Sequence, residues 1–130
     1  MSFEWSAFLH LASDLAAGGT EAKRRSSISR AYYSAFCSAR DWLLEHDSRF
    51  SMPRSGDTHR AVWDYFGMGP EKEKRQVSNT GLKLRDSRVD ADYNKDSSMF
   101  NDARPTETAL VRAQTVLKLL ETMASRGSGI

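Results

Sequence analysis

The chain has 130 residues, of which 39% are hydrophobic and 28% charged, the balance of a single soluble globular domain. Its formal net charge of +2 is too small to indicate a dedicated nucleic-acid binder, and no apolar run approaches the roughly 20 residues of a membrane-spanning helix. A lone cysteine, Cys37, excludes an internal disulfide and a cysteine-rich metal site. With no secretory leader and no metal-ligand or cofactor-binding motif, we expect a cytoplasmic protein without a cofactor.

Helical periodicity, interrupted by glycine and proline, predicts an all-α protein. The expected helices span about residues 3–17, 20–46, 58–66, 70–93 and 105–124. The fourth is continuous unless the segment from Ser78 to Gly81 kinks or divides it, and residues 125–130 are expected to fray. The sequence therefore predicts a single domain, residues 1–130, built as an antiparallel bundle of four to five helices.

The second helix carries a second set of side chains opposite its apolar stripe. Arg30, Tyr33, Cys37 and Arg40 fall within roughly 100° of arc on a helical wheel. A helix with two such faces often dimerises through the outer one, so we expect a homodimer. The alternative is an ordinary amphipathic helix with a few exposed residues of medium size.

Charged residues lie inside an apolar arc between residues 84 and 93. On the wheel, the arc of Val77, Leu82, Leu84, Val89 and Tyr93 also contains Arg85, Arg88 and Asp92. A guanidinium group near a protein interior needs a carboxylate, a phosphate or a partner chain. One interpretation is a phosphate site, in which Asp92 orients an arginine and Tyr93 donates its hydroxyl or stacks on a base. The other is an i,i+4 salt bridge between Arg88 and Asp92, worth about 0.3–0.5 kcal/mol.

His59 is the histidine best placed for chemistry. It stands at the start of the short third helix, where it could act as a general acid or base or simply cap and pack. His10 and His46 have no evident companion in the sequence.

Two segments, with residues 59–63 between them, carry a family resemblance. The first is Arg-Ser-Ser-Ile-Ser-Arg-Ala-Tyr-Tyr-Ser-Ala-Phe at residues 25–36, and the second is Leu-Arg-Asp-Ser-Arg-Val-Asp-Ala-Asp-Tyr at residues 84–93. In this order and spacing the chain resembles the HEPN superfamily from about residue 5 to 123. The resemblance implies a helical bundle that commonly dimerises. Many members are metal-independent endoribonucleases or toxins of prokaryotic defence and toxin–antitoxin systems, and others are non-catalytic partners of small nucleotidyltransferases.

Active members of that superfamily have an arginine followed about one turn later by a histidine, which transfers protons at the ribose 2′-hydroxyl. Here Asp92 or Tyr93 stands where the histidine is expected, and an aspartate beside Arg88 has a lowered pKa. The resemblance therefore implies a dimeric protein with a degenerate nuclease motif that binds RNA, a nucleotide or a partner protein. The expected phosphate-binding residues are Arg85, Arg88, Arg30 and Tyr33.

Two alternatives stay open. One is a metal-independent endoribonuclease with Arg88 on the phosphate, His59 or Tyr93 in proton transfer and Asp92 beside them. The other is a buried polar network that only fixes helix register and dimer geometry.

Overall fold

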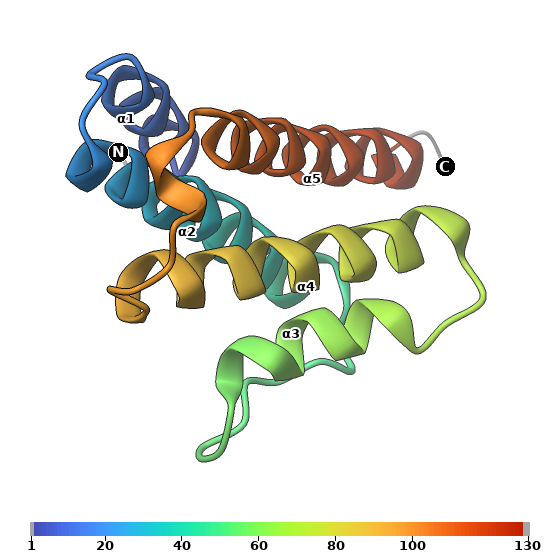
Figure 1. Ribbon diagram of the computed structural model, residues 1–130. Coiled ribbons are helices and arrows are strands. Elements are labelled where there is room, and N and C mark those ends of the chain that lie inside the picture. Colours follow the sequence, from blue (N-terminus) through green and yellow to red (C-terminus); the bar gives the residue numbers. More distant parts are fainter. Residues whose placement is uncertain (1, 129–130) are drawn as a thin grey trace.

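The computed structural model describes residues 2–128 and shows an all-α, antiparallel bundle, which confirms the predicted fold class. Its elements are α1 (Ser6–Ala16), α2 (Glu21–His46), α3 (Thr58–Gly67), α4 (Lys72–Tyr93), a 3-10 turn η1 (Met99–Asn101) and α5 (Arg104–Ser128) (Figure 1). None of the helices in the described residues is long and apolar enough to cross a membrane.

The helix boundaries follow from local chemistry. The Thr20 hydroxyl accepts a hydrogen bond from Lys23 N at 3.2 Å, and Asp57 Oδ1 accepts one from Arg60 N at 2.9 Å, so both residues cap the helices that follow them. Gly19, with a φ of 76°, provides the left-handed turn between α1 and α2.

Two helix ends differ from the prediction. α1 begins at Ser6 rather than Phe3, because Phe3 and Trp5 precede the helix and pack with Phe8 as an aromatic cluster; the Phe3 ring lies 5.2 Å from each of the other two. α5 continues as a helix to Ser128, beyond residue 125 where fraying was expected, and residues 129–130 lie outside the described part of the chain.

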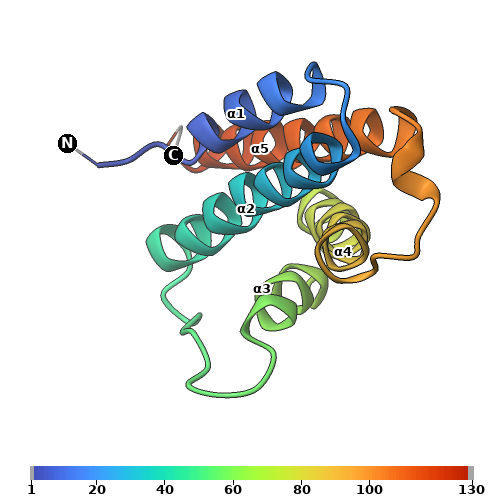
Figure 2. The same ribbon diagram turned by 60° about the vertical axis from the view of Figure 1, so that its left-hand side comes forward.

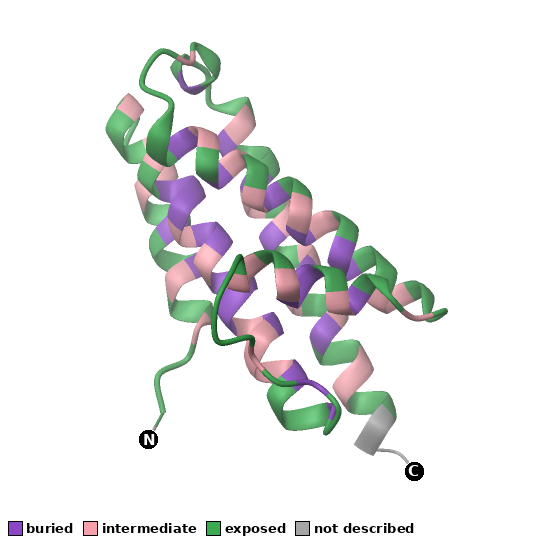
Figure 3. Cartoon of the chain, turned by 90° about the horizontal axis from the view of Figure 1, so that it is seen from below, coloured by how far each residue is buried: buried purple, intermediate pink, exposed green. Residues whose placement is uncertain are grey.

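α2, the longest helix with 26 residues, is the centre of the bundle. It packs against α1 and α5 on one side and against α4 on the other, while α3 packs chiefly on α4 (Figure 2). Buried positions lie on the faces that the helices turn toward one another (Figure 3). The largest fully buried side chains are Trp63, Tyr32, Phe66, Phe100, Ile28 and Leu43.

The buried face of α4 differs from the predicted apolar arc. Its members are Val77, Ser78, Gly81, Leu84, Arg88 and Ala91. Arg88 is buried as expected, whereas Val89 is 37% and Tyr93 76% exposed, so their assignment to the buried arc is wrong. The helix is continuous through Gly81, where a Cβ atom would lie 2.2 Å from the Trp63 ring. The glycine therefore allows close packing of α3 on α4 and does not divide the helix.

The outer face of α2 is not an open surface. Cys37 is buried, Arg30 Cζ lies 4.8 Å from the centre of the Phe8 ring, and Arg40 Cζ lies 5.6 Å from that of Trp5. The Trp5 indole also donates to Asp41 Oδ2 at 2.7 Å. α1 and the residues before it cover part of that face, since Cys37 is buried while Arg30, Tyr33 and Arg40 are half-buried. The homodimer itself stays a prediction.

Two neighbouring arginines of α2 hold the segment after α4. Arg24 Nε donates to Phe100 O at 2.6 Å, and Arg25 Nη1 donates to Ala91 O and Asn94 O at 3.0 and 2.9 Å. The Arg25 guanidinium also lies 4.6 Å from the centre of the Phe100 ring. We call these two residues the Arg24–Arg25 clamp, because they satisfy carbonyls at the C-terminal end of α4 and in η1.

Candidate functional site

Arg88 is a buried charge with few partners. It lies on the face of α4 that turns toward α2, and the residue is only 9% exposed. Its ion pair within the described residues is with Asp92 Oδ2 at 3.5 Å, longer than the roughly 2.7–2.9 Å of a charge-assisted hydrogen bond. The buried Nε has no hydrogen-bond partner in this part of the chain. Buried donors without acceptors cost free energy, so the site favours an additional acceptor.

Aromatic rings surround the same guanidinium group. Its Cζ lies 5.2 Å from the centre of the Tyr32 ring, 5.6 Å from that of Tyr33 and 6.0 Å from that of Tyr93. Cation–π contacts of this kind offset part of the cost of burying the charge. They do not replace acceptors in the guanidinium plane, where its N–H groups point.

His59 reaches the same cluster from α3. Its ring stacks on Phe36 with centroids 4.1 Å apart and planes 7° from parallel. Its Nδ1 lies 2.9 Å from the Tyr32 hydroxyl, which also accepts a hydrogen bond from Trp63 Nε1 at 3.1 Å. Burial lowers the pKa of His59, as do the positive charges of Arg88 and Arg85, and Asp57 opposes them. Burial also raises the pKa of Tyr32 to about 12, so this phenol is a neutral hydrogen-bonding group.

Arg85 connects α4 to the start of α3. Its Nη2 donates to Asp57 Oδ2 at 2.5 Å, while the other oxygen of Asp57 caps α3. The backbone hydrogen bond from Arg60 lowers the pKa of Asp57 and the charge of Arg85 adds to this, although burial opposes both. The Nε of Arg85 is buried without a partner in the described residues. This ion pair fixes the turn that carries His59.

The structure thus brings most of the sequence-predicted residues into one cluster. Tyr33 connects Arg30 to this cluster. The centre of its ring lies 5.2 Å from Arg30 Cζ and 5.8 Å from the centre of the His59 ring. Asp92 also accepts a hydrogen bond from Ser29 Oγ at 3.4 Å. Tyr93 stands beside Arg88 with its ring largely in solvent.

Three residues of the cluster, Tyr32, Phe36 and Trp63, are not among the site residues that the sequence predicts. They lie in the segments 25–36 and 59–63, which enter the sequence analysis only through the family resemblance. One signal was available for Tyr32 and Trp63, because a buried tyrosine hydroxyl or tryptophan N–H usually requires a polar partner. Nothing in the spacing identified that partner as His59.

No protein-family model, curated protein or solved structure matches the chain. In residues 2–128 no group of three or more His, Cys, Asp or Glu side chains is placed to hold a metal ion. The chemistry that the cluster itself offers is a set of N–H donors for an anion and one imidazole.

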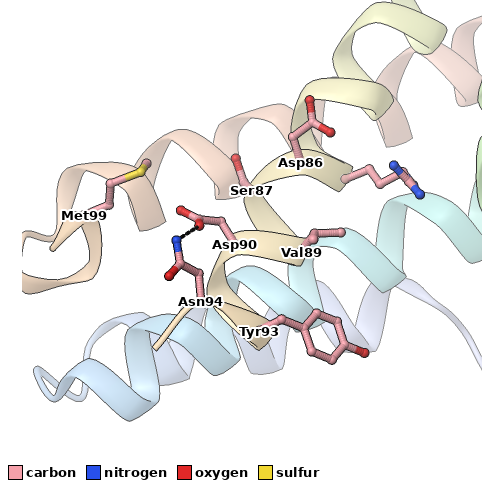
Figure 4. A pocket seen from close by; sticks show the side chains of 8 residues that line it. Asp86, Ser87, Val89, Asp90, Tyr93, Asn94 and Met99 are labelled. Atoms are coloured by element: carbon pink, nitrogen blue, oxygen red, sulfur yellow. Dashed lines mark hydrogen bonds between the residues drawn. The ribbon is translucent and has the colours of Figure 1, made fainter. Parts of the chain in front are cut away.

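A shallow hollow lies on the outer side of α4. Figure 4 shows Val89 and Tyr93 on the C-terminal part of α4 and Met99 apart from them on η1, with Asp90 and Asn94 between. The Asn94 amide donates a hydrogen bond to Asp90 Oδ1 at 2.8 Å. The hollow has a volume of about 660 Å³ and is also lined by Arg85, Asp86 and Ser87. Its two aspartates, Asp86 and Asp90, disfavour an anion in this hollow.

Proposed function

We propose that the cluster around Arg88 binds a phosphate group of RNA or of a nucleotide. The observation that carries this proposal is the buried Arg88 guanidinium, which has one long ion pair and an unpartnered Nε. A phosphate oxygen is an acceptor that the planar guanidinium fork recognises well. The resemblance to the HEPN superfamily supports the same ligand and a role in a prokaryotic defence or toxin–antitoxin system.

The neighbouring residues support a nucleic-acid ligand over a simple anion. Arg85, which lies three residues before Arg88 on α4, and His59, which contacts the same two tyrosines as Arg88, offer further donors. The Tyr93 ring, 76% exposed and 6.0 Å from Arg88, offers a surface on which a base can stack. Asp92 does not satisfy the Arg88 guanidinium by itself, because its Oδ2 atom also accepts a hydrogen bond from Ser29 Oγ.

Binding of a labelled single-stranded RNA of mixed sequence tests the proposal. We expect Arg88→Ala to weaken binding roughly ten- to hundredfold, because it removes charge-assisted hydrogen bonds to phosphate. The dependence of log affinity on log salt should also fall by about one unit. Lys118→Ala, which removes the same charge from an exposed position on α5, is the matched control and should change little.

Fluorescence anisotropy and thermal melting are to be measured on the same samples. Equal affinity of wild type and a folded Arg88→Ala variant would refute the phosphate site. If Arg88→Ala unfolds, Arg88→Lys keeps the charge but not the fork and should still lose affinity. A wild type that is folded but binds no RNA would indicate a partner protein instead, such as a nucleotidyltransferase.

A metal-independent endoribonuclease is the second candidate, and one observation favours it. His59 and Arg88 both contact Tyr32 and Tyr33 although 29 positions separate them in the sequence, so a proton-transfer group and a phosphate-binding group share one cluster. The same RNA incubated with the protein in EDTA distinguishes the two candidates. Cleavage by wild type that disappears in Arg88→Ala and His59→Ala would establish the nuclease, and intact RNA at saturation would establish binding alone.

A further inference from the structure

We infer that Tyr32, held by Trp63, is a positioning residue that keeps neutral His59 in the tautomer with its proton on Nε2. His59 then presents an N–H donor to an anion at the Arg88 site without having to become charged. The role toward a ligand rests on the proposed function, whereas the tautomer is a property of the free protein.

The direction of the hydrogen bonds follows from what each group can donate. The indole Nε1–H of Trp63 can only donate, so the Tyr32 oxygen accepts from it at 3.1 Å. Tyr32 is fully buried, and within the described residues the other partner of its hydroxyl is His59 Nδ1 at 2.9 Å. The phenolic proton therefore goes to Nδ1, which must carry a lone pair. The proton of the neutral imidazole is then on Nε2, an atom with no hydrogen bond to residues 2–128.

The opposite tautomer is disfavoured by the same network. With a proton on Nδ1, the imidazole would donate to the Tyr32 oxygen, which would then accept two hydrogen bonds. The buried phenolic proton would lose its acceptor, a loss that favours the first arrangement by roughly tenfold or more.

The charged form of His59 meets the same obstacle, because it too carries a proton on Nδ1. The charges facing the ring come from three elements: Arg88 and Arg85 on α4, Arg40 on α2, and Asp57 at the start of α3. Three of these four are positive and oppose a further positive charge. The phenol of Tyr33, at 5.8 Å, is the remaining titratable neighbour.

Two consequences distinguish this arrangement from an ordinary histidine that binds phosphate as a cation. The Nε2–H donor is present above the pKa of the imidazole as well as below it. Binding of a phosphodiester should therefore change little between about pH 6 and pH 8, where a charged histidine would be lost. The same tautomer lacks a lone pair on Nε2, so it favours the phosphate-binding function over the nuclease candidate, in which His59 would need that lone pair to act as a general base.

Nitrogen NMR of histidine-labelled protein tests the tautomer. In the wild type we expect a pyrrole-type chemical shift for Nε2 of His59 and a pyridine-type shift for Nδ1. In Tyr32→Phe we expect a mixture of tautomers and a higher titration midpoint, while His10 and His46 keep their wild-type spectra. A wild-type His59 with its proton on Nδ1, or a Tyr32→Phe spectrum identical to that of wild type, would overturn the inference. The wild-type spectrum decides the tautomer even if the variant does not fold.

Titration with an RNA that has no terminal phosphate separates this inference from the proposed function. Wild type should bind with nearly constant affinity from about pH 6 to pH 8, and Tyr32→Phe should bind about three- to tenfold more weakly at the upper end than at the lower. Wild-type affinity that falls over this range as much as that of Tyr32→Phe would refute the positioning role. The Nε2–H tautomer without any RNA binding would refute the phosphate site and leave the tautomer established.

Discussion

Arg88 is a buried charge for which the described residues provide few acceptors. Removing a guanidinium from water costs several kcal/mol, and only a close, well-formed pair offsets this. Here the pair with Asp92 is 3.5 Å long and the Nε is unpartnered within residues 2–128. Local loss of stability of this kind is common at sites that bind a ligand.

Substitution by an apolar residue of similar length tests this argument. We expect Arg88→Met to leave the free energy of unfolding unchanged or to raise it by about 1–2 kcal/mol, because it removes the buried charge. Asp92 keeps 27% of its side chain in water and stays hydrated after the change. Urea denaturation gives the measurement.

Arg25→Met is the matched control for Arg88→Met. Arg25 donates to three backbone carbonyls, those of Ala91, Asn94 and Ser97, and its loss should cost about 1–3 kcal/mol. A loss of about 3–5 kcal/mol in Arg88→Met would instead favour the polar-network interpretation, in which the charge fixes the fold.

The sequence could predict the burial of Arg88 but not the residues of other helices that surround it. A helical wheel describes one helix, so it placed Arg88 inward and its ion pair with Asp92 on one face. The hydrogen bond between Tyr32 and His59 joins two helices across 27 positions. No spacing rule relates such residues, since their meeting depends on how the helices pack.

At the scale of elements, the close packing of α3 on α4 depends on one glycine, Gly81. An added Cβ at Gly81 would lie 2.2–2.5 Å from three atoms of the Trp63 ring. The indole cannot easily move away, because it is fully buried and its Nε1 is bonded to Tyr32. The position of α3, and with it that of His59, therefore depends on the absence of a side chain at residue 81.

We expect Gly81→Ala to destabilise the protein by about 1–3 kcal/mol, although alanine is the better helix former by about 1 kcal/mol. The reason is that the extra methyl group must displace Trp63. Chemical denaturation followed by tryptophan fluorescence measures the effect. Gly69→Ala, at a position where an added Cβ has nothing within 4 Å, should be nearly neutral. A stabilised Gly81→Ala variant would show that the two helices can separate freely.

Small residues on α4 explain why the helical wheel predicts its buried face only in part. Ser78, Gly81 and Ala91 are buried but contribute little hydrophobicity to a wheel. The apparent centre of the arc therefore moved toward Val89 and Tyr93, which are larger and more apolar but exposed. Close helix packing selects for small size, which hydropathy does not measure.

At the scale of the whole molecule, Asp47 joins three parts of the chain. It is the residue after α2, its Oδ1 accepts from Arg49 N at 3.0 Å, and its Oδ2 accepts from Tyr65 Oη on α3 at 2.9 Å. Burial alone raises the pKa of Asp47, but these hydrogen bonds outweigh it and lower the pKa below its usual value.

A lowered pKa in the folded state makes Asp47 a source of acid sensitivity. Its ionised form stabilises the fold above the unfolded pKa of about 3.9, and this contribution is lost as the pH falls through the lower folded value. We expect Asp47→Asn to cost about 1–2 kcal/mol near neutral pH and progressively less as the pH falls below about 4. Urea denaturation across this pH range gives the comparison.

Tyr65→Phe serves as the control for Asp47→Asn, because it removes one of the hydrogen bonds while keeping the charge. Its cost should be smaller than that of Asp47→Asn near neutral pH. An Asp47→Asn deficit that is the same at both ends of the pH range would contradict the assignment.

The bundle as a whole was predictable from helical periodicity and from glycine and proline positions, because these signals are local. The contact between the N-terminal aromatic cluster and the outer face of α2 was not. Arg30 and Arg40 gave the appearance of an exposed surface, yet each lies over a ring that belongs to α1 or to the residue before it. Long arginine side chains cover apolar surface while their charge reaches water, so they resemble solvent-facing residues in a sequence.

The Arg24–Arg25 clamp has a consequence for how the chain is made. Arg25 binds the carbonyl of a residue 66 positions later, and Arg24 binds one 76 positions later. On a ribosome, both arginines are therefore synthesised long before their acceptors exist, while the contacts between the first two helices can form early because they are local. Until those acceptors have been added, the partners of the two arginines are local ones at the start of the second helix, the Glu21 carboxylate for Arg25 and the Gly19 carbonyl for Arg24.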